Sequence, residues 1–111
     1  MDSRREHARR LLTVPSTVIS LDGNPPTNAR LIDLSRNGVG FLSSGQLQPS
    51  AIYELQFRFP GQSVVDSVRI EIVYSTLHEA TGLFRCGARI HAMEPDSLAR
   101  LVDYVTMPIP E

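Results

Sequence analysis

Alternation of apolar and polar residues with a period of two constrains the fold of this chain more than any other feature. In the segment 52–59, IYELQFRF, apolar residues occupy every second position from Tyr53 to Phe59. The segments 68–75 and 83–93 repeat the pattern. A period of two puts alternate side chains on opposite faces of a strand, so that one face is buried and the other is solvated. We therefore predict three strands, each with one face toward the core.

The same alternation predicts which side chains face inward in the second and third of these segments. The apolar phase there is nearly unbroken, and the expected inward-facing residues are Val68, Ile70, Ile72, Tyr74, Phe84, Cys86, Ala88 and Ile90. Shorter apolar runs upstream, at 17–21, 29–34 and 39–44, are separated by the turn-forming sequences DGNPP and SRNG. Asn-Gly is a strong turn signal because both residue types tolerate positive φ. These runs predict three further strands.

The spacing of the apolar residues changes only near the end of the chain. In the segment 95–105, PDSLARLVDYV, the residues Leu98, Leu101, Val102 and Val105 recur at helical spacing and form one apolar stripe. Pro95 suits the first turn of a helix, and the prolines after the segment prevent the helix from continuing. About six strands followed by one short helix are typical of a small antiparallel barrel or sandwich. We predict a barrel with a helix packed on it.

The length of the chain is that of one domain. Its 111 residues can bury a core without disulfides or a structural metal. We therefore predict a single domain over 1–111, with a flexible N-terminal arm (1–12), a barrel (16–93) and a C-terminal helix (95–106). No apolar run approaches the roughly 20 residues of a membrane-spanning helix, so a cytoplasmic location without membrane insertion is expected.

Several classes of function are disfavoured by the composition. The net charge of −1 gives no overall attraction to nucleic acid or to an anionic membrane. Cys86 is the only cysteine, and its place in an alternating run predicts a buried small hydrophobe. The histidines lack metal-ligand spacing, and no nucleophile or phosphate-loop motif is present. We expect neither catalysis nor a metal nor a cofactor.

Two short motifs carry chemical information. Arg5 and Arg9 form R-x-x-x-R near the N-terminus, and DLSRNG places Asp33, Ser35 and Gly38 at the spacing D-x-S-x-x-G. Taken alone, the second motif is explained by a hydrogen-bonded turn between two strands, for which Asp, Ser, Asn and Gly are common residues. A run of charge at a chain terminus is usually a solvated tail. The pair of motifs, in this order, is more informative than either.

Together the two motifs resemble the signatures of the PilZ domain family, an N-terminal R-x-x-x-R and a downstream [D/N]-x-S-x-x-G. The segment GLFRCGARI is similar to the penultimate strand of that family, and LARLVDYV is similar to its closing helix. The resemblance therefore covers nearly the whole chain. It implies a six-stranded antiparallel β-barrel with a C-terminal helix, in agreement with the periodicity.

The resemblance also implies a ligand. PilZ domains bind cyclic di-GMP, a bacterial second messenger with two guanines and two bridging phosphates. Arg5 and Arg9 are then expected to contact guanine and phosphate, Asp33 and Ser35 to bond guanine as surface groups, and Gly38 to shape the turn. Arginine suits both tasks, because its planar guanidinium pairs with phosphate and with guanine and stacks on a base.

Arg4 is a further expected contact. It precedes the R-x-x-x-R motif directly, and in similar domains that position influences whether one or two nucleotides are bound. An arginine there favours two.

The implied activity is that of a stand-alone receptor or adaptor, which binds cyclic di-GMP, changes the conformation of its arm and signals to an unidentified effector protein. One alternative is a PilZ-like adaptor of pilus or polysaccharide machinery with weak or no nucleotide binding. A third hypothesis, a nucleic-acid-binding barrel, is weaker because aromatic residues make up only 6% of the chain, and such barrels need aromatic stacking platforms.

Overall fold

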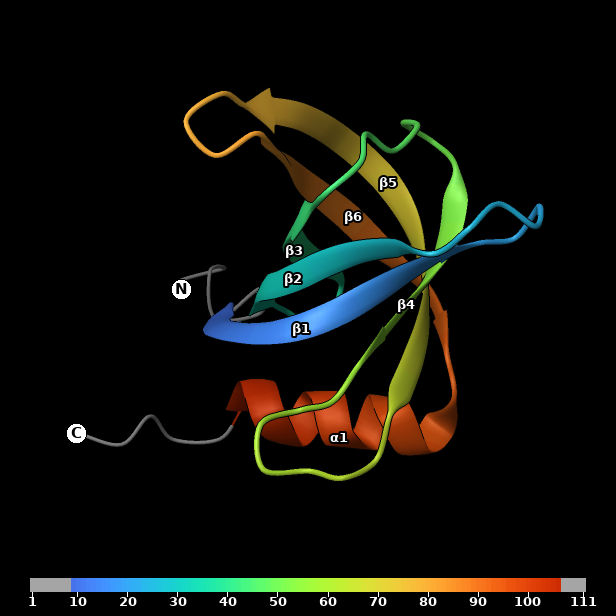
Figure 1. Cartoon of the computed structure of the whole chain (residues 1–111). Helices are drawn as coiled ribbons and strands as arrows, with labels where there is room; N and C mark the ends of the chain where they lie inside the picture. Colours follow the sequence, from blue (N-terminus) through green and yellow to red (C-terminus); the bar gives the residue numbers. More distant parts are fainter. Residues whose placement is uncertain (1–8, 107–111) are drawn as a thin grey trace, which may run out of the picture.

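The predicted barrel is confirmed by the computed structural model, which describes residues 9–106. Six strands close into a barrel in the order β1-β2-β3-β6-β5-β4, and every neighbouring pair is antiparallel (Figure 1). A helix, α1, lies below one end of the barrel in that view. The elements are β1 (Arg10–Ser20), β2 (Thr27–Leu34), β3 (Gly38–Ser43), β4 (Ile52–Phe57), β5 (Asp66–His78), β6 (Leu83–Met93) and α1 (Pro95–Thr106).

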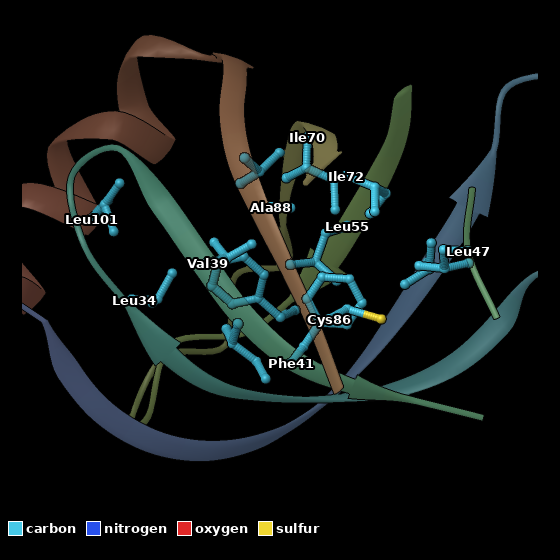
Figure 2. Close-up of a cluster of buried hydrophobic side chains, with 14 of the residues drawn as sticks. Leu34, Val39, Phe41, Leu47, Leu55, Ile70, Ile72, Cys86, Ala88 and Leu101 are labelled. Atoms are coloured by element: carbon cyan, nitrogen blue, oxygen red, sulfur yellow. The ribbon is translucent and has the colours of Figure 1, made fainter. Parts of the chain in front are cut away.

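The core lies inside the barrel and is formed mainly by inward-facing residues of the strands, with Leu101 of α1 and Leu47 of a connecting segment (Figure 2). The predicted inward residues Val68, Ile70 and Ile72 of β5 are buried, and so are Cys86 and Ala88 of β6. Val68, Ile70 and Ile72 are β-branched, and such side chains pack well on a half-buried pleated surface. Because the barrel is closed, each strand pairs with a neighbour on both sides over part of its length.

Tyr74 departs from the predicted alternation. We expected its ring to face the core, but Tyr74 is 40% exposed and Val73 is 52% exposed. The register of β5 against β6 shifts between Ile72 and Tyr74. Such a bulge inserts one extra residue into a strand and reverses the direction of the side chains that follow. The prediction for Tyr74 was wrong for this reason.

The first strand begins earlier than predicted. We assigned residues 1–12 to a flexible arm and started the barrel at residue 16, but β1 begins at Arg10, and Arg10 pairs with Leu34 and Leu11 with Asp33. Pro15 obscured this strand in the sequence. Proline lacks the backbone N–H that a strand donates to its neighbour. Pro15 is tolerated because β4 pairs with β1 only from Ser16 onward, so no hydrogen bond between β1 and β4 is lost. Residues 1–8 lie outside the described residues.

The predicted helix is confirmed, but its apolar stripe is only partly buried. Leu101 is fully buried, whereas Leu98 is 45% exposed, contrary to our expectation. The first turns of α1 are held instead by a polar contact to the start of β5. The buried Asp66 carboxylate accepts hydrogen bonds from Ser97 Oγ at 2.5 Å and from Arg100 Nη2 at 2.6 Å.

The other end of α1 contacts the start of β1. Arg10 Nη1 donates to the carbonyl oxygen of Tyr104 at 3.1 Å, and its guanidinium lies 4.5 Å from the centre of the Tyr104 ring. The last turn of α1 has no basic residue of its own. Arg10 therefore supplies the cation that stabilises the negative end of a helix.

Candidate ligand-binding site

The D-x-S-x-x-G motif occupies the end of β2, the turn that follows and the first residue of β3. Ser35 closes this turn, because its backbone N–H donates to Gly38 O at 2.9 Å and its Oγ accepts from Gly38 N at 3.0 Å. Ser35 is buried. The turn chemistry expected from the sequence is therefore present, and Ser35 is part of it.

Gly38 favours close packing and does not adopt an unusual backbone angle. Among the described residues, neither Asn37 nor Gly38 has a positive φ. The Asn-Gly pair does mark a turn, but our explanation of it by positive φ was wrong. A Cβ on Gly38 would lie 3.1 Å from the carbonyl oxygen of Ala88 in β6. The missing side chain lets the start of β3 approach β6.

Asp33 joins the two motifs. Its Oδ1 accepts a hydrogen bond from Arg9 Nη1 at 2.9 Å, and its Oδ2 accepts one from Arg85 Nη2 at 3.2 Å. Arg85 is itself fixed, because its Nη1 donates to the carbonyl oxygen of Cys86 at 2.8 Å. We expected Asp33 and Ser35 to be surface groups, but they are only 5% and 7% exposed. That expectation was wrong, because strands and arginine side chains surround them.

Two glycines make room for these side chains on the outside of the barrel. Asp33, Gly40, Gly87 and Tyr74 are successive cross-strand partners on β2, β3, β6 and β5. A Cβ on Gly40 would lie 2.8 Å from Arg85 Nη1, and one on Gly87 would lie 2.7 Å from Cζ of Tyr74. The Asp33–Arg85 pair therefore packs directly on the backbone of Gly40, and the Tyr74 ring packs on the backbone of Gly87.

A hollow of about 310 Å³ adjoins the turn. It is lined by Arg9, Ser35, Asn37, Gly38, Val73, Ala88 and Arg89. Guanidinium groups there are suited to bind phosphate or the acceptor edge of a purine. Asn37 and the Asp33 carboxylate beside the hollow can accept hydrogen bonds from N–H groups of a base.

The structure thus brings together four of the predicted site residues, Arg9, Asp33, Ser35 and Gly38. Arg4 and Arg5 lie outside the described residues. Arg85 and Arg89 were not singled out from the sequence, although the alternation in 83–93 already placed both on the outer face. Their proximity to the motif depends on the pairing of β3 with β6, which no local signal reveals.

Cys86 lies on the opposite, inner face of β6 from these arginines. It is fully buried, as predicted, and burial raises the pKa of its thiol despite a hydrogen bond with Ser75 and the nearby charge of Arg85. A buried thiol with a raised pKa is a poor nucleophile.

Residues 9–106 contain no group of three or more His, Cys, Asp or Glu side chains arranged to hold a metal ion. No helix within that range has the length and apolar character needed to cross a membrane.

Comparison with known structures identifies several similar folds. The inhibitor of motility MotI/DgrA from Bacillus subtilis superimposes with a TM-score of 0.74 at 10% sequence identity, over 92% of this chain and 49% of that one. YcgR from Escherichia coli in complex with c-di-GMP gives a TM-score of 0.72 at 21% identity, over 92% of this chain and 44% of that one. This chain therefore spans about half the length of each.

The PilZ domain of YcgR with c-di-GMP, also from Escherichia coli, gives a TM-score of 0.67 at 19% identity, over 92% of this chain and 88% of that one. At these identities the likeness establishes the fold. No curated protein sequence matches the chain. The PilZ domain model, however, matches residues 3–107. With both motifs, the barrel and the closing helix in place, the chain belongs to the PilZ domain family.

Proposed function

We propose that this protein is a receptor for cyclic di-GMP, and that the nucleotide binds over the hollow beside Ser35. The observation that carries the proposal is the ion pair of 2.9 Å between Arg9 and Asp33, because it joins the two motifs of the family at one site. Membership of the PilZ family supports the ligand, as does the similarity to YcgR, a protein solved with c-di-GMP.

In this proposal each residue has a distinct task. Arg5 and Arg9 bind phosphate and the O6 and N7 acceptors of guanine, and one guanidinium stacks on a base. The Asp33 carboxylate accepts hydrogen bonds from the N–H groups of guanine. Ser35 bonds the base or orders the turn, and Gly38 keeps the turn close to β6.

Binding requires Arg9 to exchange one partner for another. Its side chain is 61% exposed, whereas that of Asp33 is 7% exposed. Arg9 can leave Asp33 for a phosphate at little cost, because the arginine is already largely solvated and the buried carboxylate still accepts a hydrogen bond from Arg85. Arg85 remains on Asp33 and keeps its carboxylate oriented.

The proposal extends to signalling. The protein acts in the cytoplasm as a receptor or adaptor without catalysis, and an effector protein reads the bound state. The N-terminal segment that carries Arg4 and Arg5 changes conformation when it engages the phosphates. Hydrogen exchange tests this step, and new protection of the N-terminal peptide and of 33–38 at saturating cyclic di-GMP is expected. Unchanged exchange in both peptides would contradict it.

A second candidate function is favoured by one observation. Both oxygens of Asp33 already accept hydrogen bonds from arginines without any ligand. A domain whose motif is satisfied internally could serve as an adaptor that binds other proteins, of pilus or polysaccharide machinery for example, with weak or no nucleotide binding.

Isothermal titration calorimetry separates the two functions. The receptor hypothesis predicts saturable binding of cyclic di-GMP and much weaker binding of GMP and GTP, because only the cyclic dinucleotide offers two guanines to both motifs. It also predicts two nucleotides per chain, reduced in Arg4→Leu. Absence of binding by the parent protein would favour the adaptor, and an unchanged ratio in Arg4→Leu would remove Arg4 from the site.

A further inference from the structure

A second and larger hollow lies on another part of the barrel. Its volume is about 730 Å³, and it borders β1, β2, β4 and the connection that follows β4. None of its lining residues lines the hollow beside Ser35. In the closed strand order, β2-β1-β4 form one arc, whereas the first hollow lies against β3, β6 and β5. Both can therefore be occupied at once.

The second hollow carries positive charge without compensation. Arg30 and Arg58 line it, both are exposed, and no Asp or Glu is among its lining residues. Within residues 9–106, neither arginine forms an ion pair. Surface charges are usually interspersed with opposite ones, so this arrangement suits an anionic partner.

The register of the strands gives the spacing of these two charges. Pro15 pairs with Arg30 across β1 and β2, and Ser16 pairs with Phe57 across β1 and β4. Arg58 follows Phe57 and thus lies on the other side of Pro15 from Arg30. Neighbouring strands are about 4.8 Å apart, so Ala29 and Phe57, which pair with Ser16 from either side, are separated by roughly 10 Å, and Arg30 and Arg58 directly follow them.

An apolar wall completes the hollow. Phe59 is buried between Phe57, whose ring centre is 5.0 Å away, and Tyr104 of α1 at 5.5 Å. Val65 also lines the hollow and is 51% exposed. The buried rings fix the wall in place, whereas Val65 and the two arginines are exposed to a partner, and arginine is enriched where proteins contact each other.

We propose that this hollow binds an extended acidic segment of a partner protein. In the polyproline II conformation an extended chain rises about 3.1 Å per residue with three residues per turn, so two carboxylates three residues apart lie on one face and match the roughly 10 Å between the segments that carry the arginines. One apolar residue between them covers Val65. Side chains hold the segment, because from Ser16 onward β1 is already paired with β2 and β4. This proposal does not depend on nucleotide binding.

The test is an NMR titration of the full chain with a synthetic peptide, acetyl-Gly-Glu-Leu-Val-Glu-Gly-amide. Saturable shifts are expected at the amides of Asn28, Arg30, Gln56 and Val65. A peptide with Gln in place of both Glu residues should bind at least tenfold more weakly. Arg30→Gln and Arg58→Gln should each weaken binding about threefold to fivefold, as expected for one exposed ion pair.

Arg36→Gln is the matched control, because Arg36 is an exposed arginine on the β2–β3 turn and does not line this hollow. It should bind the peptide like the parent. Three results would overturn the proposal: no saturable shift with the acidic peptide, equal weakening by Arg36→Gln, or the same shifts with inorganic phosphate at equal concentration. The last would identify a site for small anions.

Discussion

Arg9 and Asp33 are joined across 24 residues of sequence by a hydrogen-bonded ion pair of 2.9 Å. The pair is asymmetric, because the arginine is largely exposed and the aspartate is buried. Arg85 completes the coordination of Asp33 from β6. The exposed Arg9 can exchange Asp33 for a ligand, while the buried Asp33 stays fixed. Mutations of the two residues should therefore have different effects on stability.

Asp33→Ala should destabilise the protein more than Arg9→Ala. Loss of the buried carboxylate leaves Arg85 unpaired and is expected to cost about 1–3 kcal/mol, which lowers Tm by roughly 4–8 °C per kcal/mol in a domain of this size. Arg9→Ala removes only the exposed partner and leaves Asp33 paired with Arg85, so it should lower stability by less than about 1 kcal/mol. Thermal unfolding followed by circular dichroism measures both. Equal shifts in the two variants would contradict the asymmetry.

Gly40→Ala should disturb the site by displacing the Asp33–Arg85 pair. The new Cβ would lie 2.8 Å from both Arg85 Nη1 and Cγ of Asp33, which is shorter than a normal van der Waals contact. We expect a loss of stability and weaker binding of cyclic di-GMP.

Gly45→Ala is the matched control for this variant. Its Cβ would make an ordinary contact of 3.7 Å with Thr27, so parent-like melting and binding are expected. If Gly40→Ala behaved like this control, the packing of the pair over Gly40 would be refuted.

Asp66→Ala should release the first turns of α1. Removal of one partner of a buried ion pair typically costs 3–5 kcal/mol, and we expect about 3 kcal/mol here because the side chain of Arg100 stays 29% exposed. Asp96→Ala, which removes an exposed acid from the first turn of the same helix, should cost only about 0.3–1 kcal/mol. Urea unfolding of the two variants provides the comparison.

The pH dependence of stability follows from the same contact. Burial raises the pKa of Asp66, but hydrogen bonds from Arg100 and Ser97 and the charge of Arg100 outweigh it and hold the pKa below its ordinary value of 3.8. The ionised carboxylate therefore stabilises the fold above about pH 4, and this contribution is lost as the pH falls through the folded-state pKa. Asp66→Ala should show a weaker loss of stability in acid. An identical acid dependence would contradict this.

Cys86 should resist alkylation in the folded protein. Its side chain is fully buried and burial raises its pKa, so little thiolate is present or accessible at neutral pH. Iodoacetamide followed by mass spectrometry should label Cys86 only in urea. Rapid labelling without urea would show that β6 opens readily.

The barrel and its closing helix could be predicted because local periodicity encodes them. Val68 to Ile72 alternate in register with a single buried face, and Leu101 lies at helical spacing. The exposure of Tyr74 could not be predicted, since the bulge depends on how β5 pairs with β6. The strand that starts at Arg10 was hidden by Pro15, whose tolerance depends on where β4 begins to pair.

Only the motif residues of the candidate site could be predicted from the sequence. Arg9, Asp33 and Ser35 were recognised from spacing, but Arg85 stands 52 residues from Asp33 and reaches it through the pairing of β3 with β6. Gly40 and Gly87 have no sequence signal of their own, because their importance comes from side chains on other strands.

Calorimetric titration of cyclic di-GMP into the parent, Arg9→Ala, Arg5→Ala and Arg36→Ala tests the central claim most directly. Hydrogen bonds to charged groups contribute about 1.5–3 kcal/mol each, and about 1.4 kcal/mol corresponds to a tenfold change in affinity. We predict that Arg9→Ala and Arg5→Ala each bind roughly 10- to 100-fold more weakly, with Arg36→Ala close to the parent. Parent-like binding by both Arg9→Ala and Arg5→Ala would contradict the account, since the nucleotide would then bind without the arginine motif.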